Sequence, residues 1–110
     1  MIREFVMMPA FEKQWKSMGL SDDDLQRLQV ELLINPQAGN VIEGTGGLRK
    51  ISFAFNGRGK RGSARVAYVD FTVHKQIYLI FAYSKNEQDN LSKEERNNIK
   101  KMIEHIEKTI

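Results

Sequence analysis

The sequence predicts an α+β fold in which an N-terminal strand and a helical hairpin pack on an antiparallel β-meander, followed by a C-terminal helix. Three observations predict it. Apolar residues recur at helical spacing within residues 9–34. Three runs rich in β-branched and aromatic residues, separated by short turn-forming segments, follow between residues 48 and 83. Helical spacing returns within residues 92–110, so the predicted order of elements is β-α-α-β-β-β-α.

The first third of the chain predicts a short strand and two helices. Residues 2–7 are expected to form the strand, and Pro9 fits the first turn of a helix, where a missing N–H costs nothing. We expect that helix to stop at Gly19 and the second to begin after Ser21, with Asp24 completing a capping box. Because proline disfavours helical geometry in the preceding residue, the second helix should end near Asn35-Pro36. The expected buried positions are Phe11, Trp15, Met18, Leu25, Leu28 and Leu32.

The middle of the chain predicts three antiparallel strands, LRKISFAF, SARVAYVDF and QIYLIFAY, separated by NGRGKRG and TVHK. Residues 36–47 are rich in turn formers and are expected to lead into the sheet. Strict alternation in the last strand gives two apolar sets, Ile77, Leu79 and Phe81 on one face and Tyr78, Ile80 and Ala82 on the other. Both faces of this strand are therefore expected to be covered, as in a central strand.

The C-terminal segment predicts a closing helix. Ser92 and Glu95 have the spacing of a second capping box. The positions that recur on one face of this helix are Ile99, Met102, Ile103, Ile106 and Ile110.

The bulk composition limits the possible classes of protein. With 110 residues and 41% hydrophobic content, we expect one domain, residues 1–110, with a single core. The absence of cysteine excludes disulfides, thiolate metal sites and cysteine nucleophiles. Charged residues interrupt the N-terminal apolar runs, so neither a signal peptide nor a membrane span is expected and the predicted location is cytoplasmic.

Positive charge is concentrated in one segment. Residues 44–83 carry seven basic side chains and one acidic one, whereas residues 1–43 carry four and seven, and residues 84–110 carry six of each. Between Glu43 and Asp70 there is no acidic residue at all. A surface that serves only solubility mixes both signs, so this segment predicts a site for a polyanion. Its cations are Arg49, Lys50, Arg58, Lys60, Arg61 and Arg65.

Strand alternation assigns these cations to faces. Lys50 is expected to share a face with Leu48 and Ser52, whereas Arg49 shares the other with a set of apolar residues, Ile51, Phe53 and Phe55. Arg65 is expected over an apolar floor, which lowers the effective dielectric and suits phosphate binding. That floor is Ala67, Val69 and Phe71.

The loop NGRGKRG adds Arg58, Lys60 and Arg61 on a glycine-rich backbone whose N–H groups can approach an anion. The alternative is a basic hairpin that keeps a sheet edge soluble. Taken one residue at a time these cations favour that alternative, and taken as a set they favour polyanion binding.

Other candidate sites in the sequence are weaker. His74 and His105 are far from the basic loop and are interpreted as surface or packing residues. The run Asp22–Asp24 is explained by a helix N-terminus rather than a metal cluster. The segment GTGG at 44–47 lacks the context of a phosphate-binding loop and is interpreted as a turn. We therefore predict no metal and no cofactor.

Three motifs in order, NPQAGNVIEGTGGLRKISFA, GKRGSARVAY and IYLIFAYSKNEQDNLSKEE, resemble the HigB branch of the RelE/ParE superfamily of bacterial toxins over nearly the whole chain. The resemblance implies the RelE-like form of the fold above. It also implies a type II toxin that cleaves mRNA in the ribosomal A site without a metal, through attack of a ribose 2′-hydroxyl on the adjacent phosphorus. A cognate antitoxin would hold it inactive.

The resemblance also implies roles for residues. Arg65 matches the phosphate-clamping arginine of the family, and Arg49 and Lys50 correspond to the basic positions that orient RNA or withdraw the 2′ proton. Lys85 falls where the family places a basic residue beside the scissile phosphate. Contacts to RNA are assigned to Arg58, Lys60, Arg61 and Tyr83.

The chain departs from the family at the segment SKNEQDNL, which lacks the tyrosine that some RelE toxins place after the last strand. The acid that protonates the leaving oxygen is left open among Lys85, Tyr83 and Glu87.

Two other functions stay open at this point: a ParE-like, non-catalytic inhibitor of DNA gyrase, and a non-catalytic RNA-binding module. The expected partners are the ribosome with its mRNA and an antitoxin. That antitoxin should carry an acidic or disordered segment that masks the positive groove, together with a DNA-binding helix-turn-helix. The toxin alone is expected to be monomeric.

Overall fold

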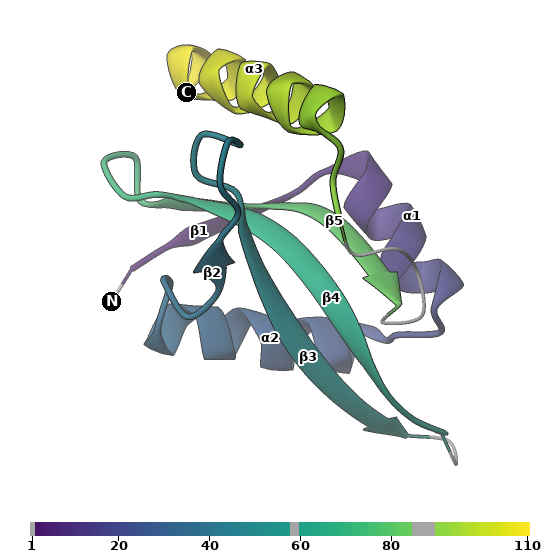
Figure 1. Ribbon diagram of the computed structural model, residues 1–110. Helices are drawn as coiled ribbons and strands as arrows, with labels where there is room; N and C mark the ends of the chain where they lie inside the picture. The colour runs from purple at the N-terminus through teal and green to yellow at the C-terminus, as the bar shows by residue number, and fades with distance from the viewer. Residues whose placement is uncertain (1, 58–59, 85–89) are drawn as a thin grey trace.

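The computed structural model of the protein describes residues 2–57, 60–84 and 90–110, with the backbone alone for residues 56, 57, 60 and 61. The predicted α+β class and the predicted order of elements are confirmed, with one additional short strand (Figure 1). The elements are β1 (Glu4–Met7), α1 (Pro9–Ser17), α2 (Asp22–Ile34), β2 (Asn40–Val41), β3 (Arg49–Gly57), β4 (Lys60–Phe71), β5 (Gln76–Ser84) and α3 (Lys93–Thr109).

These strands form one five-stranded sheet in the order β1-β5-β4-β3-β2. The predicted antiparallel meander of β3, β4 and β5 is confirmed. β1 adds to it parallel to β5, which makes the sheet mixed. The segment 36–47, which is rich in turn formers, also contains a strand that was not predicted, because Asn40 and Val41 pair with Lys50 and Arg49 as β2. Two residues are too few to give a strand pattern in the sequence.

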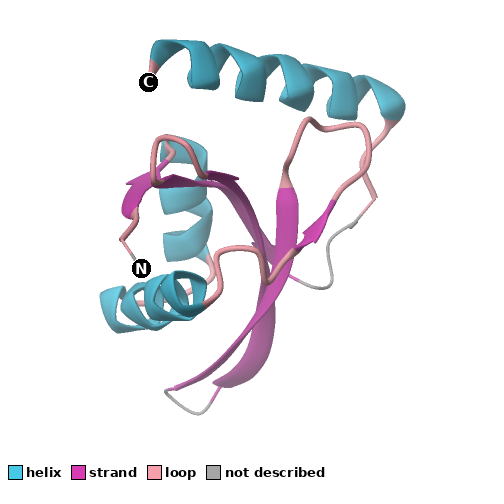
Figure 2. Cartoon of the chain, turned by 90° about the vertical axis from the view of Figure 1, so that its left-hand side faces the viewer, coloured by secondary structure: helices cyan, strands magenta, loops and turns pink. Residues whose placement is uncertain are grey.

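The sheet has helices on both faces, and each face has its own apolar cluster. Figure 1 shows α3 on one side of the sheet and α2 on the other, and Figure 2 shows the same separation after a quarter turn. The larger cluster packs α1 and α2 on the sheet and includes Phe11, Trp15, Leu28, Leu32, Phe53, Val66, Tyr68 and Leu79. The second packs α3 on the opposite face and includes Leu48, Ala67, Val69, Phe71, Ile80, Ile99, Ile103 and Ile106.

The helix boundaries follow the predicted caps. Pro9 is the first residue of α1, and Gly19 takes a positive φ of 76° just after it, a conformation that favours glycine. Both capping boxes, Ser21 with Asp24 and Ser92 with Glu95, have the two reciprocal hydrogen bonds. The bond from the Ser21 backbone N–H lowers the pKa of Asp24, because it stabilises the ionised carboxylate. No helix of the described residues is long and apolar enough to cross a membrane.

A β-bulge in β5 changes the predicted alternation. The pairing with β4 runs regularly to Tyr68 opposite Leu79 and resumes with Ala67 opposite Phe81, so Ile80 is an extra residue. Ile80 and Phe81 therefore both pack in the α3-side cluster, and Ala82 packs on the α1–α2 side. The expected grouping of Phe81 with Ile77 and Leu79 was wrong, because the bulge inverts the alternation for every later residue of the strand.

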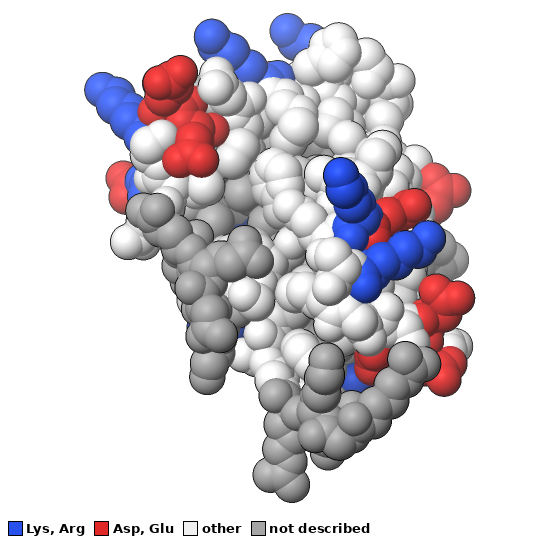
Figure 3. All heavy atoms as spheres, turned by 90° about the vertical axis from the view of Figure 1, so that its right-hand side faces the viewer, with Lys and Arg blue, Asp and Glu red and all other residues white. Residues whose placement is uncertain are grey.

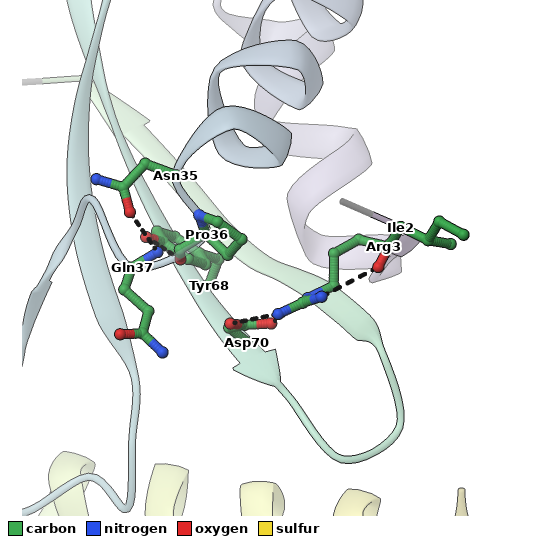
Figure 4. A network of polar contacts seen from close by, with 7 residues as sticks. All are labelled: Ile2, Arg3, Asn35, Pro36, Gln37, Tyr68 and Asp70. Atoms are coloured by element: carbon green, nitrogen blue, oxygen red, sulfur yellow. Dashed lines mark hydrogen bonds and ion pairs between the residues drawn. The ribbon is translucent and has the colours of Figure 1, made fainter.

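An ion pair ties the N-terminus to β4. Arg3 Nε donates to Asp70 Oδ1 at 2.8 Å and Arg3 Nη2 donates to Asp70 Oδ2 at 3.4 Å (Figure 4). The Asp70 side chain is only 2% exposed and that of Arg3 11%. The hydrogen bond to Asp70 raises the pKa of Arg3 further above its usual value.

Candidate functional site

The face of the sheet beneath α3 carries two rows of side chains that cross β3, β4 and β5. In the first row, Arg65 on β4 lies opposite Ser52 on β3 and opposite Tyr83 on β5. In the second row, Ala67 lies opposite Lys50 and Phe81. Lys50 and Arg65 are diagonal neighbours, whose Cβ atoms are roughly 7–8 Å apart in such pairs, within reach of long side chains. The structure therefore brings Lys50, Arg65 and Tyr83 to one face.

A hydrogen bond orients Arg65 along this face. Its Nη1 donates to Ser52 Oγ at 2.8 Å, across the β3–β4 pairing. Arg65 and Lys50 are both partly exposed, so they can meet a ligand from solvent. Their floor is apolar as predicted, because Ala67, Val69 and Phe71 belong to the α3-side cluster.

Arg49 lies on the other face of the sheet. It is opposite Tyr68 of the α1–α2 cluster, and its Nη1 donates to the carbonyl oxygens of Gly39 at 2.7 Å and Gln37 at 3.3 Å. The structure thus separates Arg49 from Lys50, as strand alternation predicted, and from the catalytic group to which the family resemblance had assigned it.

The segment 36–39, whose carbonyl oxygens accept hydrogen bonds from Arg49, is also hydrogen-bonded to Tyr68 (Figure 4). The Tyr68 hydroxyl donates to the Pro36 carbonyl oxygen and accepts from the Gly39 N–H, both at 2.9 Å. Burial raises the pKa of Tyr68 above its usual value, so the hydroxyl stays protonated and available as a donor. A Cβ at Gly39 would be 2.9 Å from the Lys50 carbonyl oxygen. This close approach leaves no room for a side chain at position 39.

A cavity of about 350 Å³, which we name the α3 cavity, lies between α3 and these rows. Its floor is formed by Leu48, which immediately precedes β3, and by three sheet residues, Ala67, Phe81 and Tyr83. Glu95, Asn98 and Ile99 of α3 lie opposite them, and Gln14 of α1 contributes to one wall. The cavity thus adjoins Lys50 and Arg65 through their neighbours Ala67 and Tyr83.

Several predicted site residues lie outside the part of the chain whose side chains the structure describes. Lys85, Glu87 and Arg58 lie outside the described residues, and of Lys60 and Arg61 only the strand backbone is described. These assignments stay predictions from the sequence.

The structure also places the weaker candidate sites of the sequence, which are the two histidines, the run Asp22–Asp24 and the GTGG segment. His74, in the turn between β4 and β5, and His105, on α3, are both exposed. Asp24 caps α2, and the GTGG segment is a turn that leads into β3. Within residues 2–57, 60–84 and 90–110, no three His, Asp or Glu side chains are grouped to hold a metal ion.

Among the described residues, one face of the molecule carries charged side chains of both signs. On the face drawn in Figure 3, Lys and Arg side chains occur beside Asp and Glu side chains, with a broad band of uncharged atoms between them. This agrees with a formal charge of only +3 for the whole chain.

Comparison with known proteins identifies the family. A family model described as the RelE toxin of the RelE/RelB toxin–antitoxin system matches residues 6–110. The chain belongs to the RelE toxin family. It is thus a toxin of a toxin–antitoxin system, as the motifs of its sequence predicted.

A solved structure supports the RelE fold. The Escherichia coli toxin RelE, solved in the free state as a double mutant with two arginines replaced by alanine, has a TM-score of 0.54 to this chain at 19% sequence identity. The similarity covers 78% of this chain and 86% of that one. At this identity it establishes that the RelE-family toxin described here shares the fold.

Some residues in and beside the site of this RelE-family toxin could not be recognised from its sequence. Ser52 was placed on the right face but not recognised as the partner of Arg65. Asn98 and Glu95 were assigned to the helix alone, although they line the α3 cavity. Helix periodicity gives the face that a residue occupies, but it does not tell whether that face meets a packed surface or a cavity.

Proposed function

We propose that this RelE-family toxin is a ribosome-dependent endoribonuclease that cleaves mRNA in the A site without a metal. The observation that carries the proposal is the placement of Lys50 and Arg65 as diagonal neighbours on one face, with Tyr83 directly opposite Arg65. Two cations at this separation fit a single phosphate and its ribose. The motifs of the sequence resemble those of the HigB branch of the family, and that subtype is part of the proposal.

The proposed reaction is an internal phosphoryl transfer. The ribose 2′-oxygen forms a bond to the adjacent phosphorus while the bond from phosphorus to the 5′-oxygen breaks, which leaves a 2′,3′-cyclic phosphate and a 5′-hydroxyl. One proton leaves the 2′-hydroxyl and one is delivered to the 5′-oxygen. The protein must align the attacking oxygen with the leaving one and stabilise the added charge on the phosphate.

Arg65 is proposed to stabilise that charge, because a planar guanidinium can donate two parallel hydrogen bonds to phosphate oxygens. Its bond to Ser52 fixes one side of the guanidinium before substrate binds. Lys50 is proposed to orient the nucleotide and accept the 2′ proton. Lys85 is proposed to lie beside the scissile phosphate, and Tyr83, Lys85 and Glu87 are the candidates for the acid. Arg58, Lys60 and Arg61 are proposed to contact the RNA backbone.

Arg49 is not part of the proposed catalytic set. Its side chain lies on the α1–α2 face and donates to backbone carbonyls of residues 37 and 39. We propose that it supports the segment packed against the backbone of Lys50 and does not touch RNA.

The proposed partners are an antitoxin and the ribosome carrying mRNA. An acidic antitoxin segment would neutralise Lys50 and Arg65 and cover the face they share. The protein is proposed to act in the cytoplasm, where translating ribosomes are.

Analysis of cleavage products tests the proposed function. Purified toxin added to ribosomes with a defined mRNA codon in the A site should produce fragments with 2′,3′-cyclic phosphate and 5′-hydroxyl ends, with or without a metal chelator. The same mRNA without ribosomes is the control and should stay intact. Intact mRNA on ribosomes, with inhibited gyrase supercoiling, would instead establish the gyrase inhibitor. Intact mRNA on ribosomes with toxin bound would establish the RNA-binding module.

The neighbours Arg49 and Lys50 provide a matched pair of variants. Lys50→Ala should lower the cleavage rate by about 100-fold or more, because it removes a group in contact with the reacting ribose and phosphate. Arg49→Ala should lower the free energy of unfolding by about 1–2 kcal/mol through lost charged hydrogen bonds. Its cleavage rate per folded molecule should stay within a few-fold of wild type. Cleavage by Lys50→Ala at the rate of Arg49→Ala would contradict the assignment.

A further inference from the structure

Helix α1 reaches the neighbourhood of the site through the polar side chain of Gln14. Figure 1 shows α1 beside the last part of β5, and Gln14 Oε1 accepts a hydrogen bond of 2.9 Å from the Ala82 N–H. Gln14 also lines the α3 cavity together with Tyr83. Because Ala82 is only 1% exposed, its buried N–H needs a partner within the protein. The proposed reaction assigns no role to Gln14.

We propose that Gln14 is a positioning residue, which holds β5 in its bulged register and thereby keeps Tyr83 opposite Arg65. The proposal rests on the proposed function, because it is there that Tyr83 and Arg65 are assigned to the RNA. It adds to the site a residue of a helix that packs on the other face of the sheet. Gln14 acts through Tyr83 and does not touch the RNA itself.

The edge of the sheet beside β5 is only partly covered by β1. The Leu79 carbonyl oxygen accepts from the Met8 N–H at 2.9 Å, and the pairing stops there because Pro9 begins α1. Ala82 lies beyond this point on β5. A buried N–H without an acceptor is costly. The Gln14 side chain supplies the acceptor that a longer β1 would have provided.

The hydrogen bond between Gln14 and Ala82 fits only the bulged register of β5. Successive residues of a regular strand direct their backbone groups to opposite edges. Since the Leu79 carbonyl faces β1, the Ala82 N–H would face β4 in a regular strand. The extra residue Ile80 inverts that order and turns the Ala82 N–H toward Gln14. The same inversion turns the Tyr83 side chain toward α3, so this bond favours the orientation of Tyr83 that the site needs.

The helix that carries Gln14 is anchored in the core. Phe11 and Trp15, which precede and follow Gln14 on α1, are both buried, and their rings stack with centroids 5.3 Å apart. Trp15 Nε1 also donates to the Ser21 carbonyl oxygen at 3.1 Å. Gln14 therefore reaches Ala82 from a packed base, and its hydrogen bond constrains the end of β5 rather than the helix.

Amide hydrogen exchange of the full-length protein measures the proposed constraint. Gln14→Leu keeps a side chain of similar size but removes the acceptor. The Ala82 amide should then exchange about 10- to 100-fold faster, the usual consequence of leaving a buried donor unsatisfied. Gln14→Glu keeps an acceptor oxygen and should restore protection. The Met8 amide, bonded to Leu79 at the end of β1, should exchange at the wild-type rate in both variants.

Single-turnover cleavage on ribosomes tests whether Gln14 acts through Tyr83. Gln14→Leu should lower the rate at saturating toxin by about 10- to 100-fold, as expected when a group in the site is misplaced. In a Tyr83→Ala background the same change should have no further effect, because the side chain that it positions is already absent. Gln26→Leu, the same substitution at an exposed position of α2, is the control and should cleave at the wild-type rate.

The outcomes separate this inference from the proposed function. Wild-type exchange of the Ala82 amide in Gln14→Leu, or equal acceleration at Met8, overturns the constraint on β5, whatever the cleavage assay shows. A loss of rate that persists in full in the Tyr83→Ala background overturns the action through Tyr83. If wild-type toxin cuts no mRNA on ribosomes while Gln14→Leu still unprotects Ala82, the proposed function is overturned and the hold of Gln14 on the β5 register stands.

Discussion

Arg65→Ala is expected to lower the rate of mRNA cleavage on ribosomes by about 100- to 1,000-fold, the usual cost of removing one donor to a transition-state anion. The physical reason is the loss of the guanidinium that Ser52 Oγ orients at 2.8 Å on the α3 face. Arg65→Lys should recover only part of the rate, because an ammonium group keeps the charge but cannot form two parallel hydrogen bonds to phosphate. Single-turnover cleavage with excess toxin measures the chemical step.

The control for Arg65→Ala is an arginine-to-alanine change on the opposite face of the sheet. Arg27 lies on α2, with its side chain 56% exposed, and Arg27→Ala should cleave at the wild-type rate. Both variants should unfold in urea as single cooperative transitions. Cleavage by folded Arg65→Ala within ten-fold of Arg27→Ala would show that Arg65 does not contact the reacting phosphate.

Arg3→Met is expected to lower the free energy of unfolding by about 3 kcal/mol, because it leaves the carboxylate of Asp70 buried without its cation. The Asp70 side chain is 2% exposed, so water cannot replace the two hydrogen bonds from Arg3. Urea unfolding at neutral pH measures the loss as a lower midpoint with an unchanged slope.

An exposed ion pair in the same chain provides the comparison for Arg3. Arg27 Nη2 lies 3.0 Å from Asp24 Oδ1, with the side chains 56% and 21% exposed, and Arg27→Met should cost about 1 kcal/mol or less. The double variant Arg3→Met with Asp70→Leu should recover most of the stability, because no unpaired charge then stays buried. Equal losses of unfolding free energy in Arg3→Met and Arg27→Met would mean that burial does not strengthen the ion pair between Arg3 and Asp70.

Local sequence signals predicted most of the elements and part of the site. The capping boxes at Ser21 and Ser92, the break at Gly19 and the apolar stripes of the helices depend on residues close together in the chain. Alternation in β3 placed Lys50 and Ser52 on one face. It also separated Lys50 from Arg49, although the family resemblance had assigned both to catalysis.

The position of Tyr83 shows where local reasoning fails. Strict alternation from Ile77 would direct Tyr83 toward α1 and α2, yet it lies opposite Arg65 on the α3 face. The cause is the β-bulge at Ile80, which is an extra residue in the pairing of β5 with β4. An apolar run such as QIYLIFAY carries no mark of a bulge, because residues on both faces are hydrophobic.

The sequence by itself determined the α+β class, the caps, the concentration of cations in residues 44–69 and the motifs of the RelE toxin family. These properties depend on residue type and short spacing. Only the tertiary structure decided that Lys50 and Arg65 share a face, how the bulge orients Tyr83, and that a cavity lies under α3. Those properties depend on strand register and on the packing of elements distant in the chain, which no local pattern encodes.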